Sequence, residues 1–114
     1  MYQAQRETRK TCAMLWLLTY SSAALCIGAQ FAACAEYGVA VEINSRPERL
    51  DPPRRLLRQA VEAGCLFSID TDGHAPGQLD WQPYGCARAE ECGVPVERIV
   101  NAWPVRDLLD WAQG

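Results

Sequence analysis

Two short apolar segments separated by one amphipathic helix constrain the fold of this chain more than any other feature. Residues 39–43 and 65–69 are each five residues long and apolar nearly throughout, as expected of parallel strands that are buried on both faces. Residues 54–63 between them place leucine, alanine and valine side chains on one helical face and three arginines on the opposite face. The order of strand, helix and strand predicts an α/β fold with a parallel sheet.

Glycines and prolines mark the expected ends of the helices. Residues 31–37 form a helical segment that ends at Gly38, a common junction between a helix and a strand. Asp51 stands where an N-cap is expected, with Pro52 at the first helical position, and Gly64 follows the same helix. After the second strand we expect a loop or weak turn over residues 77–85, and short helices over residues 86–92, 95–100 and 104–111.

The beginning of the chain has the layout of a signal peptide. Residues 11–35 contain no charged side chain and follow a basic head, and the Ala-Cys-Ala sequence at residues 33–35 suits cleavage after export. Residues 11–29 are also close to the length of a membrane anchor, but polar side chains at residues 19–22 dilute their apolar character. Export or membrane anchoring is therefore the alternative to a cytoplasmic protein.

Composition and charge change near Phe31, which favours a second interpretation of the beginning. Residues 1–30 are then an apolar leader, signal-like or the product of a truncated gene, and residues 31–114 are a domain fragment. This second part carries eight arginines against thirteen acidic residues, a net charge of −5. Such a balance argues against a broad basic face for duplex nucleic acid, without excluding a local arginine cluster.

The chain contains six cysteines, and their spacing indicates whether they are reduced, paired in disulfides or bound to zinc. The chain contains no Cys-x-x-Cys pair, and Cys86 and Cys92 are too far apart for a zinc knuckle. Cys34 and Cys65 lie in apolar segments, where cysteine behaves as a small buried hydrophobe. We therefore expect reduced thiols rather than disulfides or a zinc site.

Polar side chains follow both predicted strands. Glu42 and Asn44 lie at the end of the first strand, and Asp70, Asp72 and His74 follow the second. Ligands bind at the carboxyl ends of strands in α/β sheets and barrels. Asp72 and His74 offer a carboxylate oxygen and an imidazole nitrogen, which Zn²⁺, Mn²⁺ and Fe accept as ligands. From these residues alone, a turn cap, a surface histidine and a charged strand end are the alternatives.

Three strings carry a resemblance to a known family: VAVEINSRPERLDPP, LFSIDTDGHAPGQLDWQPYG and NAWPVRDLLDW. Together they resemble the closing segment of a PHP (polymerase and histidinol phosphatase) domain, particularly that of bacterial X-family DNA polymerases. The family shows a Glu-Ile-Asn strand, a Thr-Asp-x-His-x-Pro strand end and a final helix with Asn, Pro, Leu-Leu and Trp. Here Gly73 stands where alanine is usual, and we expect this change to be mild.

The resemblance implies a distorted (β/α)7 barrel, of which this chain holds the last two βα units. It also implies a cluster of divalent metal ions (Zn, Mn or Fe) that activates water for attack on a phosphoester, such as a DNA 3′ end. At the positions that match the family's motif, the resemblance implies that Asp72 and His74 are the last two metal ligands. Glu42, Asn44 and Arg46 contact substrate or line the rim of the site, and no catalytic residue is assigned.

The chain departs from the family in its single histidine. PHP domains draw most of their ligands from earlier strands, starting with a His-x-His pair, and those strands are absent here. Two protein ligands leave too many open positions for tight binding, so we expect little activity without the missing N-terminal part of the domain. Strands cut from a barrel also leave edges unpaired. The competing interpretation is a small exported or membrane-anchored binding protein without catalysis.

Overall fold

Two parallel strands organise the mixed α/β fold that the computed structural model describes for residues 24–114. Strands β1 (Ala40–Asn44) and β2 (Leu66–Asp70) pair so that Val41 lies opposite Phe67 and Ile43 opposite Ile69. Helix α3 (Arg54–Ala63) connects the two strands. The predicted βαβ unit is therefore confirmed, whereas the (β/α)7 barrel stays a prediction.

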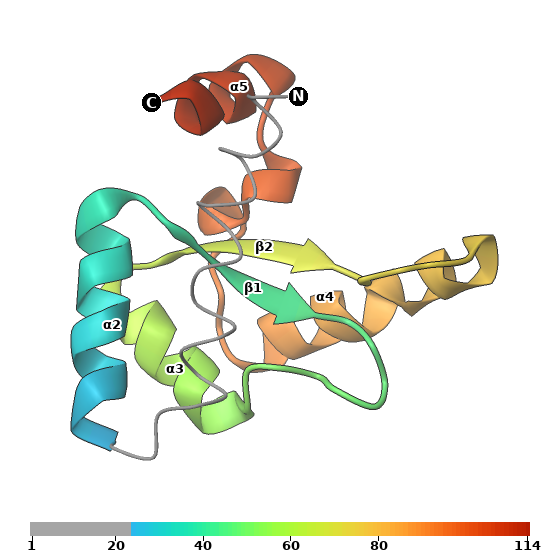
Figure 1. Cartoon of the computed structure of the whole chain (residues 1–114), viewed down its shortest axis with the longest axis horizontal. Helices are drawn as coiled ribbons and strands as arrows, with labels where there is room; N and C mark the ends of the chain where they lie inside the picture. Colours follow the sequence, from blue (N-terminus) through green and yellow to red (C-terminus); the bar gives the residue numbers. More distant parts are fainter. Residues whose placement is uncertain (1–23) are drawn as a thin grey trace.

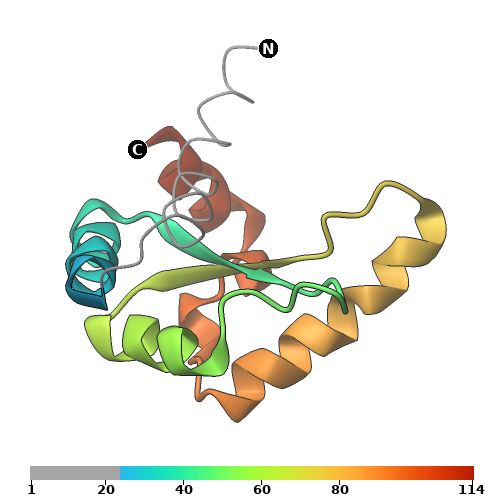
Figure 2. The ribbon, with the colours of Figure 1, turned by 60° about the horizontal axis from the view of Figure 1, so that its bottom comes forward.

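Helices flank the sheet on two sides. In Figures 1 and 2, α3 and α4 lie below the strands and α5 lies above them. The remaining elements are α2 (Ala24–Tyr37), η1 (Pro76–Trp81), α4 (Gln82–Glu91), η2 (Val96–Arg98), η3 (Val100–Ala102) and α5 (Val105–Gln113). Helix α4 begins four residues before the predicted residue 86, because the Gln82-Pro83 segment starts the helix instead of continuing the loop.

One face of the sheet supplies the hydrophobic core. Val41 and Ile43 from β1 and Phe67 and Ile69 from β2 belong to a single buried cluster. Side chains alternate along a strand, so these four share a face. They pack with buried residues from the surrounding helices, among them Phe31 of α2, Leu57 of α3 and Ala89 of α4. Both strands are largely buried on both faces, as predicted. The opposite face is not apolar throughout, however, because it carries Glu42, Asn44, Ser68 and Asp70 beside Ala40 and Leu66.

Helix α3 has the predicted bounds, Arg54–Ala63, but a different N-cap. Its N-cap is Pro53, not Asp51, because the helix begins at Arg54, two residues later than a cap at Asp51 would place it. The Asp51 carbonyl accepts a hydrogen bond from the Asn44 amide at 2.8 Å. This bond ties the loop between β1 and α3 to the end of the strand. Gly64 ends the helix at φ 85°, a left-handed conformation that glycine adopts without steric cost.

Helix α2 crosses the predicted boundary between residues 30 and 31. It runs from Ala24 to Tyr37, and Ile27 and Phe31 are both buried in the core cluster. The Ala-Cys-Ala sequence at residues 33–35 lies inside this helix, with Cys34 buried. Most of the predicted leader, residues 1–23, lies outside the described residues. The division of the chain at residue 30 stays a prediction.

Two further expectations concern the membrane and the cysteines. Within residues 24–114, no helix has both the length and the apolar character that crossing a bilayer requires. Cys34, Cys65, Cys86 and Cys92 are free thiols, and three of them are buried. The expectation that the cysteines are reduced stays a prediction. Cys12 and Cys26 lie outside the side chains that the structure describes.

The outer edge of β2 is covered, contrary to the expectation of open edges on both strands. Phe67 forms an isolated parallel bridge with Ile99, which lies between η2 and η3. The segment after α4 therefore returns to the sheet and lies beside β2. It takes the place of a third strand over this short stretch.

Candidate functional site

Four polar side chains lie next to Ala40 and Leu66 on the face of the sheet opposite the core. Glu42 and Asn44 of β1 stand opposite Ser68 and Asp70 of β2 in the strand register. Asn44 is 1% exposed and Ser68 is 7% exposed, and within the described structure neither Asn44 Nδ2 nor Ser68 Oγ has a hydrogen-bond partner. Buried polar groups without partners cost free energy. Their gathering on one face marks this side of the sheet as the candidate site.

Glu42 and Asp70 form a carboxyl pair on that face. Burial raises the pKa of Glu42 to about 8, with further contributions from the hydrogen bond to Asp70 and from the charges of Asp70 and Asp72. Burial also raises the pKa of Asp70, although its hydrogen bond with Glu42 acts in the opposite direction. Both pKa values are raised, so the two carboxyl groups favour holding one proton between them in their mutual hydrogen bond.

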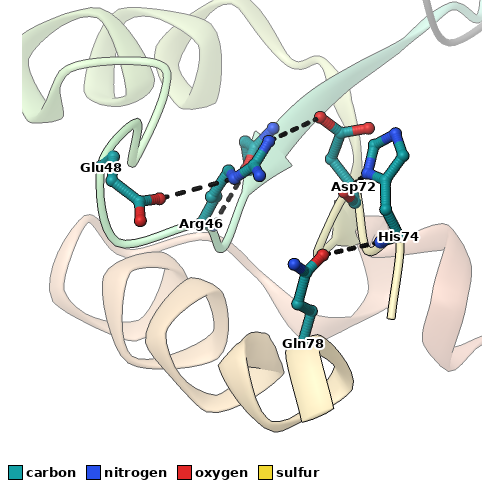
Figure 3. A network of polar contacts seen from close by, with 6 residues as sticks. Arg46, Glu48, Asp72, His74 and Gln78 are labelled. Atoms are coloured by element: carbon teal, nitrogen blue, oxygen red, sulfur yellow. Dashed lines mark hydrogen bonds and ion pairs between the residues drawn. The ribbon is translucent and has the colours of Figure 1, made fainter. Parts of the chain in front are cut away.

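Arg46 connects the loop after β1 to the loop after β2. Its main-chain amide donates to Asn44 Oδ1 at 2.9 Å, which fixes the turn that leaves the strand. Its guanidinium lies 3.5 Å from Glu48 Oε2 and 3.6 Å from Asp72 Oδ2, and 5.5 Å from the ring centre of Trp81. Figure 3 shows Arg46 between the two carboxylates. The Arg46 guanidinium thus lies next to the Asp72 carboxylate.

Asp72 and His74 lie side by side after β2 (Figure 3). Asp72 has a left-handed backbone with φ 49°, which aspartate tolerates better than most residues. His74 Nδ1 lies 2.8 Å from the Asp72 carbonyl oxygen, and the His74 amide donates to Gln78 Oε1 at 2.7 Å. A carbonyl only accepts, so Nδ1 carries a proton, and in the neutral imidazole Nε2 then keeps its lone pair. This tautomer is the one that binds a metal through Nε2.

Gly73 fits between these two residues without strain. A Cβ at this position would lie 2.9 Å from Thr71 Oγ1, which is closer than such atoms pack. An alanine here requires the Thr71 hydroxyl to move. Having glycine instead of the usual alanine at residue 73 therefore affects only the contact with the Thr71 side chain, which is able to rotate.

The structure brings the predicted site residues together only in part. Asp72 contacts both His74 and Arg46, and Asn44 positions Arg46. Glu42 instead pairs with Asp70, a partnership that the sequence analysis did not predict. Asp70 ends β2 on the same face as Asn44, and this position was the available signal. Over residues 24–114 there is no group of three or more His, Cys, Asp or Glu side chains placed to hold a metal.

Comparison with known proteins gives one informative similarity. No family model matches the chain. It is 32% identical over 69 residues to a Bacillus subtilis (strain 168) protein described as DNA polymerase/3′-5′ exonuclease PolX. The match covers 60% of this chain and 12% of the relative, so the chain spans about an eighth of the relative's length. This similarity relates the chain to X-family DNA polymerases.

Proposed function

We propose that this chain is the closing part of a PHP-type metallo-phosphoesterase domain, containing the last two βα units of its distorted (β/α)7 barrel. The function of the whole domain is hydrolysis of phosphoesters with a divalent metal ion, as a 3′–5′ exonuclease or phosphatase acting on DNA 3′ ends or similar substrates. The observation that carries the proposal is the Asp72–His74 pair beyond β2, with the imidazole held in its metal-binding tautomer.

Three further observations support this proposal. The pair follows the carboxyl end of a parallel strand, where α/β proteins place their sites. The adjoining face of the sheet carries buried polar atoms in place of apolar ones. The similar Bacillus subtilis protein is described as a 3′-5′ exonuclease, which is an activity on phosphodiesters. A DNA-processing domain works in the cytoplasm, a reducing compartment in which the four free thiols are stable.

The chain's own residues have distinct roles in this proposal. Asp72 offers a carboxylate and His74 offers Nε2 as the last two ligands of Zn²⁺, Mn²⁺ or Fe. Such an ion, when bound, lowers the pKa of water so that hydroxide forms near neutral pH. Arg46 lies at the rim within 3.6 Å of Asp72, where its charge complements a substrate phosphate. Glu42 and Asn44 line the wall of the site.

Two ligands fit the donor chemistry of such a metal but do not complete a site. Stable sites in proteins use at least three protein ligands, and the described residues offer no third one. The missing N-terminal part of the domain is therefore the partner that we expect to supply the others. The isolated chain should bind metal weakly and hydrolyse little.

An activity assay tests this proposal. Purified chain is assayed with Mn²⁺ or Zn²⁺ on a chromogenic phosphoester and on DNA with a free 3′ end, next to His74→Ala and to Glu97→Gln as a surface control. We expect all three proteins to be nearly inactive. Vigorous turnover that His74→Ala abolishes and Glu97→Gln preserves would show a complete active site in this chain, and would contradict the proposal of a fragment.

A further inference from the structure

The beginning of helix α3 has an unusual distribution of charge. Its N-cap is Pro53, which provides no side-chain hydrogen bond, and its first turn contains no acidic residue. Arg54 and Arg55 occupy that turn instead. The N-terminus of a helix carries partial positive charge and unpaired amides, which favour acidic side chains or bound anions. Two arginines at this end therefore oppose the local preference.

A third arginine, Arg88 of helix α4, lies near this first turn of α3. Arg88 is only 7% exposed, and neither its Nε nor its Nη1 has a hydrogen-bond partner within the described part of the chain. Glu91 and Cys92, three and four residues later, share the helix face of Arg88. Glu91 Oε2 accepts a hydrogen bond from Arg54 Nε at 2.8 Å, and Cys92 Sγ lies 3.9 Å from the Arg54 carbonyl. This face of α4 thus packs against the first turn of α3.

The cost of this arrangement is electrostatic. Burial lowers the pKa of Arg88, and the nearby charge of Arg54 lowers it further, although Cys92, Asp51 and Glu91 act in the opposite direction. The Nε and Nη1 groups of this buried guanidinium lack the hydrogen bonds that water would supply. Of the two acids that act on Arg88, Asp51 has the larger effect, and Glu91 is already paired with Arg54. One ligand with negative charge and several acceptor oxygens would satisfy both arginines and the free amides of the helix.

We propose that the N-terminus of α3, together with Arg54 and Arg88, binds a phosphate group in the form of inorganic phosphate or a terminal phosphate monoester. On binding, Arg54 breaks its ion pair with Glu91 and contacts the anion instead. This loses little free energy, because the Arg54–Glu91 pair is exposed. Arg88 gains the acceptors that it lacks, and the first-turn amides point toward the bound anion. This site shares no residue with the Asp72–His74 pair. Its failure would leave the proposed metal ligands untouched.

Phosphate binding by the complete chain tests the site. Inorganic phosphate is titrated against the protein at constant ionic strength, with chloride as the reference anion, while the backbone amide signals of residues 54–56 are followed by NMR. The variants are Arg88→Met and Arg54→Gln, and the matched control is Arg58→Gln, an exposed arginine one turn further along α3. We expect saturable shifts of these amides, about tenfold weaker binding in either variant, and a change of less than about twofold in the control.

Two results would overturn the proposal. One is an identical response to phosphate and chloride, and the other is unchanged phosphate affinity in Arg88→Met. This variant replaces a buried unpartnered cation by an apolar side chain of similar length, so it should fold; if it does not, Arg54→Gln and the amide shifts decide. A parallel titration with a nucleoside 5′-monophosphate identifies the source of the anion. Tighter binding than inorganic phosphate supports a monoester, and equal binding supports free phosphate.

Discussion

Asn101 completes the outer edge of β2 by binding both backbone groups of Ile69. Its Oδ1 accepts from the Ile69 amide at 2.7 Å, and its Nδ2 donates to the Ile69 carbonyl at 2.9 Å. The side-chain amide thereby takes the place of a neighbouring strand at this residue. Gln82 Nε2 donates to the same carbonyl at 2.9 Å. The final segment of the chain thus stabilises the strand that carries the Asp72–His74 pair.

Asn101→Ala should destabilise the fold, because it leaves the Ile69 amide without its acceptor. Removing these two hydrogen bonds to a nearly buried residue should cost about 1–3 kcal/mol. Urea denaturation followed by circular dichroism measures the change, with Gln113→Ala, an exposed amide near the chain end, as the control. Equal stability of Asn101→Ala and the control would mean that the edge is satisfied in another way.

Gly85→Ala should disturb the packing between α4 and the sheet. A Cβ at residue 85 would overlap the Ser45 hydroxyl and lie 2.7 Å from Ile69 Cγ2. Overpacking of this kind costs about 1–3 kcal/mol, which outweighs the better helix propensity of alanine. Thermal unfolding should show the loss. Gly77→Ala is the matched control, because a Cβ there meets nothing within 4 Å; an equal response of both variants would argue against the close approach of α4.

Glu42→Gln should flatten the dependence of stability on pH. The pKa of Glu42 rises from 4.5 to about 8 on folding, so the folded state holds a proton that the unfolded state releases. The contribution of this group is fully present below its unfolded pKa and is lost as pH rises through about 8. Unfolding free energy should therefore fall between about pH 5 and pH 9 in the wild type, and less in the variant.

The control for this prediction is Glu48→Gln, because Glu48 is an exposed carboxylate on the loop after β1. Glutamine at residue 42 still donates a hydrogen bond to Asp70 but does not titrate. Parallel pH curves for the wild type and Glu42→Gln would show that Glu42 is ionised in the folded protein, and that the carboxyl pair does not share a proton.

Ile27→Ala tests whether the end of the predicted leader belongs to the domain. Ile27 is 7% exposed and lies in the core cluster with Phe31, so its truncation should cost about 2–5 kcal/mol. Leu109→Ala, at a position that is 47% exposed, should cost much less. Chemical denaturation of both variants gives the comparison. A negligible effect of Ile27→Ala would support an unrelated leader that extends to residue 30.

The sequence predicted local features better than pairings between elements. The bounds of α3 follow from the prolines before it and from Gly64 after it, which are strong local signals. The proximity of Asp72 and His74 follows from their spacing and from the turn at Asp72. No feature of the local sequence predicted the hydrogen-bonded pair of Glu42 and Asp70, because that pairing depends on strand register and burial together. Asp51 was taken for an N-cap because an aspartate followed by a proline is typical of a helix start, whereas the helix begins only after the second proline.

The most direct test of the proposed function is the response of the His74 ring to a metal ion. The chain has a single histidine, so the two nitrogen signals of its imidazole are assigned without ambiguity. Because two ligands bind metal weakly, we predict that a large excess of Zn²⁺ shifts the Nε2 signal, that Nδ1 stays protonated, and that Asp72→Asn weakens the response while Glu97→Gln does not. A Nε2 signal that is unmoved by Zn²⁺, or one that responds equally in Asp72→Asn, would contradict the assignment of Asp72 and His74 as metal ligands.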